Sequence, residues 1–499
     1  MTEKFKEPKS LLYLALTVGA LLTILQVTVS VDLYRDSANV YSFMARSLAA
    51  GNIRDAFHPA IPSLNILLAH PFTLAGLRPE QSLGLVSCLF YLFSIPFLYL
   101  LLKEFLPEQH AGVGTLLYAF APKVIRFSCS AIIDSGKLFF LISALYFALR
   151  LIRGKFRSCA LALGFGAMLG GLSLARSEGI GSALILAGCV AVYYVIDILR
   201  QKKLPPILPV LTAAAAFLLL LASRVYLNYR TCGKFIYDLR ISNGINRIIA
   251  KLTGAATAVA AAPTRQDGTS WMHLLNQNLR GAYEVYLFFA IIGIIIFILA
   301  VRWKNCNKIY PDKQIPSFVK WDSFYLVFAA CILGNILIFK LAHISAYRYF
   351  LLDIPLLMVF TLIGLHWSWC WCAKFIPVPL LYLTIAVVFF FQIENGAENF
   401  FSKSSRRRYD AGIYVGKLLD AEHNTGRVWF QTACIEWYYS GMRRAFPIEQ
   451  PQPDPRTFRD FEYVLLEADE HDIKVIEARK DLREIPLPQE YRIRLFQRI

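Results

Sequence analysis

The sequence has little charge for its length. Asp, Glu, Lys and Arg make up only 17% of its 499 residues, whereas 56% of the residues are hydrophobic and the mean hydropathy is +0.47. Soluble globular domains have a charged fraction of about 25%. Apolar windows of about 20 residues recur along the chain, and each is long enough to cross a hydrocarbon core about 30 Å thick. The sequence therefore predicts an α-helical polytopic membrane protein.

The sequence also lacks the motifs of common metal and redox sites. It has ten cysteines but no CxxC pair, and most of them lie within or beside apolar runs, where a thiol behaves as a small hydrophobic side chain. No DxD pair and no ligand spacing indicate a metal centre, so we assign no cofactor and leave dependence on a divalent metal open. Whether Cys232 and Cys434 form a disulfide is also left open.

Basic residues outnumber acidic ones, and the formal net charge is +17. They are spread over short connections between apolar runs instead of forming one face, so we expect no nucleic-acid partner. This distribution fits a cytoplasmic N-terminus under the positive-inside rule, and contact with anionic lipid head groups. On this topology the densest basic clusters are cytoplasmic, and they comprise Arg150, Arg153, Lys155, Arg157, Arg200, Lys202, Lys203, Arg302, Lys304 and Lys308.

About eleven apolar runs meet the length criterion for a membrane span. They cover residues 11–31, 80–102, 110–128, 136–152, 158–175, 179–198, 207–224, 283–301, 323–340, 350–368 and 376–393. The first has a longer apolar core than a secretory signal, so we expect it to stay uncleaved. With a cytoplasmic N-terminus, an odd number of spans places the C-terminal region outside. We expect a transmembrane domain over residues 1–395 and an outer domain over 396–499.

The composition changes near residue 402, where polar residues become frequent. A helical pattern follows Arg406–Arg408, and a second one covers residues 473–482. Strand-like runs cover residues 427–434, 463–467 and 491–496. Strands that alternate with helical patterns predict a small α/β domain of about 100 residues.

The first outer loop, residues 32–79, holds two acids next to a membrane surface. Residues 37–50 have the pattern of a short amphipathic helix, and residues 62–77 that of a helix lying in the interface. Asp36 fits the N-cap of the first helix, where it would contribute about 1 kcal/mol. It also fits a general base, because a capping acid can keep one oxygen free. Asp32 lies nearer the end of the span, and we interpret it as a solvated interfacial charge.

The other polar candidates lie on the same predicted side of the membrane. Each has an ordinary structural explanation as a helix cap, a bend, an ion pair or an interfacial anchor. Their shared position favours a cavity for a charged substrate. Acids at the ends of membrane spans are costly to bury, which favours a functional role for them. Arginine can bind phosphate through paired N–H donors. The candidates are Arg35, His58, Asp134, Lys137, Arg176, Glu178, Tyr347 and Arg348.

The order of these motifs resembles that of the GT-C glycosyltransferases. The similarity is to the bacterial branch related to protein mannosyltransferases and lipid A aminoarabinose transferases, and it runs over nearly the whole chain. The matching segments are Arg35-Asp36-Ser37, His58-Pro59, Asp134 within SAIIDSGKLFF, LARSEGI at residues 174–180, Tyr347-Arg348-Tyr349, and RRRYDAGIYVGKLL and VWFQTACIEWYYSG in the tail.

The resemblance implies a multispan core in the bacterial inner membrane, with a cavity that opens to the periplasm. It implies a sugar donor carried on polyprenyl phosphate, a lipid, glycan or protein acceptor, and inversion at the anomeric carbon. Carried onto this sequence, it makes Asp36 the general base and assigns the donor phosphate to Arg348, with Lys137 or Arg176. Two departures stand out. Asp36-Ser37 replaces an Asp-Glu pair, and HPAIP replaces a Lys-Pro-Pro-Leu type of sequence, which leaves a phosphate-binding lysine unassigned.

Two other functions share this topology. A lipid-linked sugar transporter or flippase would need charges along a path through the middle of the spans, whereas nearly all charges here gather at span ends. An inverted-repeat transporter should also show paired broken spans, and none is evident. A glycan polymerase or ligase, which uses a pyrophosphate-linked oligosaccharide, stays open. We therefore expect a glycosyltransferase, with these functions as alternatives.

Overall fold

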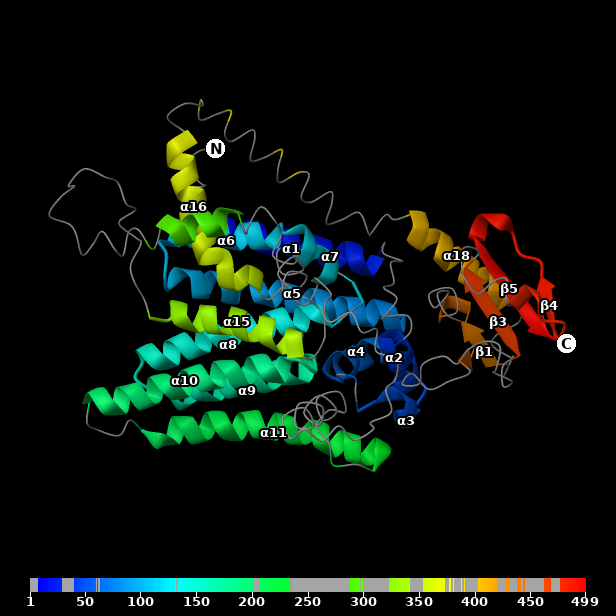
Figure 1. The fold of residues 1–499 in the computed structure, drawn as a ribbon, viewed down its shortest axis with the longest axis horizontal. Helices are drawn as coiled ribbons and strands as arrows, with labels where there is room; N and C mark the ends of the chain where they lie inside the picture. The colour runs from blue at the N-terminus through cyan, green and yellow to red at the C-terminus, as the bar shows by residue number, and fades with distance from the viewer. Residues whose placement is uncertain are drawn as a thin grey trace.

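The fold consists of a helical bundle and one small sheet near the C-terminus (Figure 1). This architecture confirms the predicted class, a polytopic helical membrane protein with a small C-terminal α/β part. The computed structural model describes residues 8–28, 40–59, 61, 63–128, 130–131, 133–201, 206–233, 235, 288–296, 298, 323–341, 353–372, 377, 380, 387, 390, 403–419, 427–430, 438–440, 443–444, 462–467 and 476–499.

The bundle is built from long apolar helices that pack side by side (Figure 1). Four of them, α5, α8, α10 and α11, contain a stretch long and apolar enough to cross a membrane. The helices of the bundle are α1 (Pro8–Thr28), α5 (Pro79–Lys103), α6 (Glu108–Ala119), α8 (Asp134–Arg153), α9 (Cys159–Ala175), α10 (Gly179–Gln201), α11 (Ile207–Cys232), α15 (Tyr325–Leu341) and α16 (Asp353–Cys372).

Local sequence signals set where these helices begin. Helix α5 opens with Pro79, whose missing N–H costs nothing in a first turn, and the Gln81 side chain accepts a hydrogen bond from the Arg78 N–H at 3.3 Å. Helix α9 opens after Ser158, whose hydroxyl accepts from the Leu161 N–H at 3.2 Å. At these two helices the predicted start lies within one residue of the observed one, whereas α11 (Ile207–Cys232) extends eight residues beyond its predicted end at 224.

The predicted span over residues 110–128 is wrong as a single helix. Helix α6 ends at Ala119, and a separate helix, α7 (Pro122–Ser128), begins at Pro122. A proline ring clashes with the carbonyl of the residue four positions earlier, which favours a break or a kink. The chain breaks at Pro122, whereas α5 continues through Pro96. Of the predicted span at 283–301 the structure describes a helical part at residues 288–296, and most of 376–393 lies outside the described residues.

Helix α9 packs against both α8 and α11. The approach to α11 is close, because a Cβ atom at Gly166 would lie 2.1 Å from the carbonyl oxygen of Ala213. Only glycine fits at such a helix crossing. Helix α11 otherwise exposes large apolar side chains, among them Leu218 and Leu219. It is thus an outer helix of the described bundle, held chiefly by α9.

The segment predicted as the first outer loop contains three short helices at one end of the bundle, beside the sheet (Figure 1). They are α2 (Ser42–Ala49), α3 (Ile53–Ala56) and α4 (Leu64–Leu74). The helices predicted within residues 37–50 and 62–77 are therefore present. Helix α2 buries Met44 and Ala45, and it packs against α3, α4 and α5. Residues 31–39, which include Asp32, Arg35 and Asp36, lie outside the described residues.

The sheet has the strand order β2-β1-β3-β5-β4. Its first three strands run parallel, and β5 and β4 continue the sheet antiparallel. The helix α18 (Lys403–Leu418) precedes it in the chain. The strands are β1 (Arg427–Phe430), β2 (Arg443–Arg444), β3 (Tyr463–Glu467), β4 (Leu482–Ile485) and β5 (Ile493–Arg498).

The strands predicted at 427–434, 463–467 and 491–496 correspond to β1, β3 and β5. The helix predicted over residues 473–482 is wrong at its end, because helical structure covers only Ile476 and Glu477 of the described part, and Leu482 opens β4. Residues of β4 pair with β5, for example Ile485 with Leu495. This tertiary pairing overrides the local helical pattern. Cys434 lies outside the described residues.

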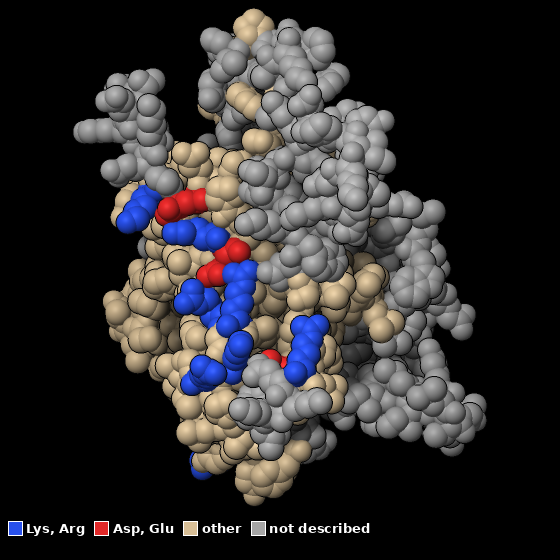
Figure 2. Space-filling model, turned by 90° about the vertical axis from the view of Figure 1, so that its left-hand side faces the viewer, with Lys and Arg blue, Asp and Glu red and all other residues tan. Residues whose placement is uncertain are grey.

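The bundle has two chemically different ends. One, the sheet end, carries α2, α3, α4 and the sheet (Figure 1). The other, the basic end, gathers Lys and Arg side chains in a row (Figure 2), with Lys103, Arg150, Arg153 and Arg200 in the last turns of α5, α8 and α10. Some of these cations pair with acids, as Arg150 does with Glu104 at 3.1 Å.

Candidate active site

A buried group of charged side chains lies where α8, α9 and α10 meet. Asp134 is the first residue of α8, and Arg176 and Glu178 lie in the short connection from α9 to α10. The Arg176 guanidinium donates to Asp134 Oδ1 through Nη1 and to Glu178 Oε1 through Nε, the latter at 2.6 Å. All three side chains are less than 10% exposed. The ion pair between Arg176 and Glu178, the ordinary structural explanation for these two residues, is therefore present, and Asp134 joins it, whereas their predicted role in substrate binding stays a prediction.

The backbone of the connection fixes these side chains in place. Helix α9 ends at Ala175, and Arg176 has an extended conformation, with φ −151° and ψ 148°. Helix α10 begins at Gly179, where a Cβ atom would lie only 2.0 Å from the carbonyl oxygen of Leu172. The chain thus turns against the last part of α9 without room for a larger residue. The turn directs Arg176 toward α8 and keeps Glu178 beside it.

Lys137 and Asp353 complete the group. Lys137 lies one turn after Asp134 on α8 and is 3% exposed, and Asp353 is the fully buried first residue of α16. Lys137 interacts electrostatically with Glu178, Arg176, Asp134 and Asp353. Three carboxylates and two cations therefore share one buried region, which we call the charged cluster. Burying charge is costly unless it is paired, so such a group in a membrane protein points to function.

One atom of the charged cluster can still receive a ligand. The second carboxylate oxygen of Asp134, Oδ2, is buried and has no hydrogen-bond partner among the described residues. Buried polar atoms are nearly always hydrogen-bonded, so an orphaned oxygen at this depth needs an explanation. A hydroxyl, an amine or a water molecule could donate to it.

A second group lies near the His58-Pro59 turn. His58 is half-buried, and its carbonyl oxygen accepts a hydrogen bond from the Ile61 N–H at 3.0 Å. Arg224 of α11 is 2% exposed, and its Nη2 lies 3.5 Å from the carbonyl oxygen of Pro59. The structure therefore places a buried guanidinium beside the turn at which the sequence left a phosphate-binding cation unassigned.

Sequence reasoning missed Arg224 and Asp353. Arg224 closes an apolar run, where a cation is usually taken for an interfacial anchor. Asp353 lies inside the apolar run predicted as the span at 350–368, and an acid within a span is by itself a sign of function. That sign was available in the sequence. The partners of Asp353 were not, because they lie on α8, more than 200 residues earlier in the chain.

Arg35, Asp36, Tyr347 and Arg348 lie outside the described residues, so their roles stay predictions. Two of them lie close in sequence to described helices. Asp36 precedes the first residue of α2 by six positions, and Arg348 precedes Asp353 by five. Among the described residues, no three His, Cys, Asp or Glu side chains are arranged to hold a metal ion.

The fold is that of known membrane glycosyltransferases. ArnT from Cupriavidus metallidurans bound to undecaprenyl phosphate is similar with a TM-score of 0.60 and 12% identity, covering 98% of this chain and 98% of ArnT. The oligosaccharyltransferase AglB from Archaeoglobus fulgidus, solved with an inhibitory peptide and a dolichol-phosphate, gives a TM-score of 0.54 and 14% identity, covering 93% of this chain and 70% of AglB.

The arabinofuranosyltransferase AftD from Mycobacteria gives a TM-score of 0.50 and 12% identity, covering 98% of this chain and 40% of AftD. These likenesses define the class of protein, a membrane protein with the GT-C fold. Residues 58–226 also match the family model of dolichyl-phosphate-mannose-protein mannosyltransferase. Among curated proteins, none matches the chain in sequence. The predicted resemblance to GT-C glycosyltransferases is confirmed at the level of the fold, and residues 58–226 also resemble a mannosyltransferase family in sequence.

Proposed function

We propose that this glycosyltransferase moves a sugar from a polyprenyl-phosphate donor to a lipid, glycan or protein acceptor at the outer face of the bacterial inner membrane, with inversion. The observation that carries this proposal is the charged cluster at the sheet end of a GT-C fold. The likeness to ArnT, whose structure holds undecaprenyl phosphate, supports the donor class.

The two ends of the bundle support this orientation. The last turns of α5, α8 and α10 are basic, as the positive-inside rule requires of the cytoplasmic side. The charged cluster, α2 and the sheet then belong to the periplasmic side, and residues 396–499 form the outer domain. Nucleotide sugars are absent from that compartment, so a lipid-linked donor is the chemically consistent choice.

Cations from separate elements hold the donor phosphate in this proposal. Arg176 is already committed to two carboxylates, so we assign it to positioning Asp134 and Glu178. Arg224 supplies the cation that the HPAIP sequence lacks, because its guanidinium lies beside Pro59. Lys137 and Arg348 add positive charge from the starts of α8 and α16. Arginine suits this role because its N–H donors match phosphate oxygens.

The reaction needs one base. The acceptor hydroxyl attacks the anomeric carbon on the face opposite the phosphate, the carbon–oxygen bond to polyprenyl phosphate breaks, and configuration inverts. Asp36 takes the hydroxyl proton, and the phosphate leaves with the bonding electron pair. Because phosphate is a good leaving group, orientation and charge stabilisation supply most of the catalysis. Asp134 Oδ2 accepts a hydrogen bond from the bound sugar, and His58, Tyr347 and Arg35 line the donor site.

The test is transfer activity in membranes, with a radiolabelled polyprenyl-phosphate sugar pool as donor. We expect Asp36→Asn to lose activity, because asparagine still caps a helix but cannot take a proton. Asp32→Asn is the matched control and should keep activity. Full activity of Asp36→Asn would reduce Asp36 to a helix cap. Activity only with a pyrophosphate-linked oligosaccharide would instead identify a polymerase or ligase.

A further inference from the structure

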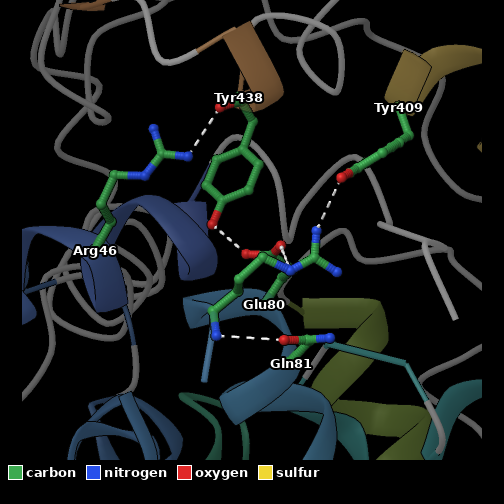
Figure 3. Close-up of polar contacts among 6 residues, drawn as sticks. Arg46, Glu80, Gln81, Tyr409 and Tyr438 are labelled. Carbon is green, nitrogen blue, oxygen red and sulfur yellow. Dashed lines mark hydrogen bonds and ion pairs between the residues drawn. The ribbon is translucent and has the colours of Figure 1, made fainter. Parts of the chain in front are cut away.

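A buried tyrosine joins the C-terminal part of the chain to the first outer loop (Figure 3). Tyr438 is 1% exposed, and its hydroxyl donates to Glu80 Oε2 at 2.7 Å. Its backbone carbonyl accepts from Arg46 Nη2 at 2.8 Å. The Arg46 guanidinium also lies over the tyrosine ring, 4.0 Å from its centroid. Tyr438 therefore contacts both α2 and the start of α5.

The contacts extend to a second tyrosine. Glu80 pairs through Oε1 with Arg78 Nε at 3.3 Å, and Arg78 Nη1 lies 3.4 Å from the Tyr409 hydroxyl of α18 (Figure 3). The two tyrosines differ in what they hold. Tyr438 contacts Arg46 of α2, whereas the Tyr409 hydroxyl, among the described residues, bonds to Arg78, the residue before α5. Tyr409 is thus a natural control for Tyr438.

The tyrosine hydroxyl is a dependable donor at this position. Burial, together with the neighbouring Glu80 carboxylate, raises the pKa of Tyr438 above its usual value, so the hydroxyl stays protonated. A hydrogen bond from a neutral hydroxyl to a buried carboxylate is stronger than one between neutral groups. The hydrogen bond to Glu80 therefore holds the ring of Tyr438 in place relative to α5. The guanidinium of Arg46 then makes its cation–π contact with a ring in a fixed position.

Helix α2 is the described element nearest in sequence to Asp36. Its inner side is held by Met44 and Ala45, while Arg46 reaches the C-terminal part of the chain. Ser42, the first residue of α2, lies six positions after Asp36. A shift or rotation of α2 would therefore move the C-terminal end of the segment that carries the proposed base. Displacement of a catalytic group by about 1 Å can cost about a hundredfold in rate.

We propose that Tyr438 is a positioning residue that fixes α2 against the start of α5 through Arg46 and Glu80, and so places the segment that carries Asp36. The proposal rests on the proposed function, in which Asp36 is the base. It gives the C-terminal part of the chain a role in the transfer step. Removal of the contact should lower kcat and leave the apparent KM for the donor unchanged, because the polar contacts of Tyr438 among the described residues are to Glu80 and Arg46 and not to Lys137 or Arg224.

The experiment uses the full chain in lipid nanodiscs. Tyr438→Phe keeps the ring under Arg46 but removes the bond to Glu80, Arg46→Met removes the contact from the other side, and Tyr409→Phe is the matched control. We expect Tyr438→Phe and Arg46→Met each to lower kcat about tenfold. This factor corresponds to the free energy that about one hydrogen bond to a charged group contributes. The double variant should be no worse than Arg46→Met, since the two contacts form one series that joins α2 to α5, and loss of either one breaks it.

Hydrogen exchange of the α2 amides, measured without substrate, gives a readout independent of activity. We expect faster exchange over residues 42–50 in Tyr438→Phe and not in Tyr409→Phe. Unchanged exchange, or faster exchange with unchanged kcat, overturns the proposal, as does an equal loss of kcat in Tyr409→Phe. If wild-type protein transfers no sugar, the proposed function fails and the catalytic half of this proposal falls with it. The exchange result then still decides whether Tyr438 holds α2.

Discussion

Asp134 and Arg176 form an ion pair that is closed to solvent on both sides, with 6% of each side chain exposed. The pair joins the first turn of α8 to the connection between α9 and α10, although the two residues are 42 positions apart in sequence. Glu178 extends it to a triad. The charged cluster therefore depends on the mutual position of three helices.

Removal of the central cation should destabilise the bundle. Arg176→Met leaves Asp134 and Glu178 buried without their partner, and an uncompensated buried charge costs about 3–5 kcal/mol. Thermal or chemical unfolding in detergent measures the loss. Arg150→Met is the control, because its pair with Glu104 is half-exposed and such pairs contribute about 0–1 kcal/mol. Equal stability of the two variants would show that the triad is not structural.

Arg224 should act on the donor. Arg224→Ala removes the guanidinium beside Pro59, so we expect the apparent KM for the polyprenyl-phosphate sugar to rise at least tenfold. Arg230→Ala, on the same helix but exposed, should leave the KM unchanged. A normal KM in both variants would remove Arg224 from the donor site and leave the phosphate to Lys137 and Arg348.

Arg348→Ala should weaken donor use while expression stays normal. The proposed function assigns Arg348 to the donor phosphate, and in sequence it lies five residues before Asp353 of the charged cluster. Titration of the donor at saturating acceptor measures the effect. An unchanged apparent donor affinity contradicts the assignment of Arg348 to the phosphate.

The crossing of α9 and α11 should not tolerate a larger residue at Gly166. Gly166→Val places side-chain atoms against the Ala213 carbonyl, and we expect a loss of about 1–3 kcal/mol from overpacking. Gly188→Val in α10 is the control, because a Cβ atom there meets nothing within 4 Å. Thermal unfolding in detergent compares the two. A normal melting temperature for Gly166→Val would mean that α11 can move away from α9 without cost.

The helical bundle could be predicted because membrane spans follow from composition and length alone. Only a partial sign of the break between α6 and α7 is present in the sequence, because Pro122 lies at the break but Pro96 lies inside the continuous helix α5. Strand β4 was not, because its residues become a strand only by pairing with β5. Such pairings are tertiary and leave no local pattern.

The site was predicted in parts. Arg176 and Glu178 are neighbours in sequence, so their ion pair could be expected. The contribution of Asp353 to the same region depends on how α16 packs near α8, which spacing does not encode. The same holds for Tyr438: an aromatic residue in the tail gives no sign in sequence that it bonds to Glu80, 358 residues earlier.

Strand β4 bounds one edge of the described sheet, and its two central residues, Arg483 and Glu484, are exposed and charged. Glu484 is held by Arg494 of the neighbouring strand at 2.5 and 2.6 Å. A short edge with fixed charges is a poor template for a strand of another molecule. This edge therefore disfavours strand pairing between the sheets of neighbouring copies in one membrane.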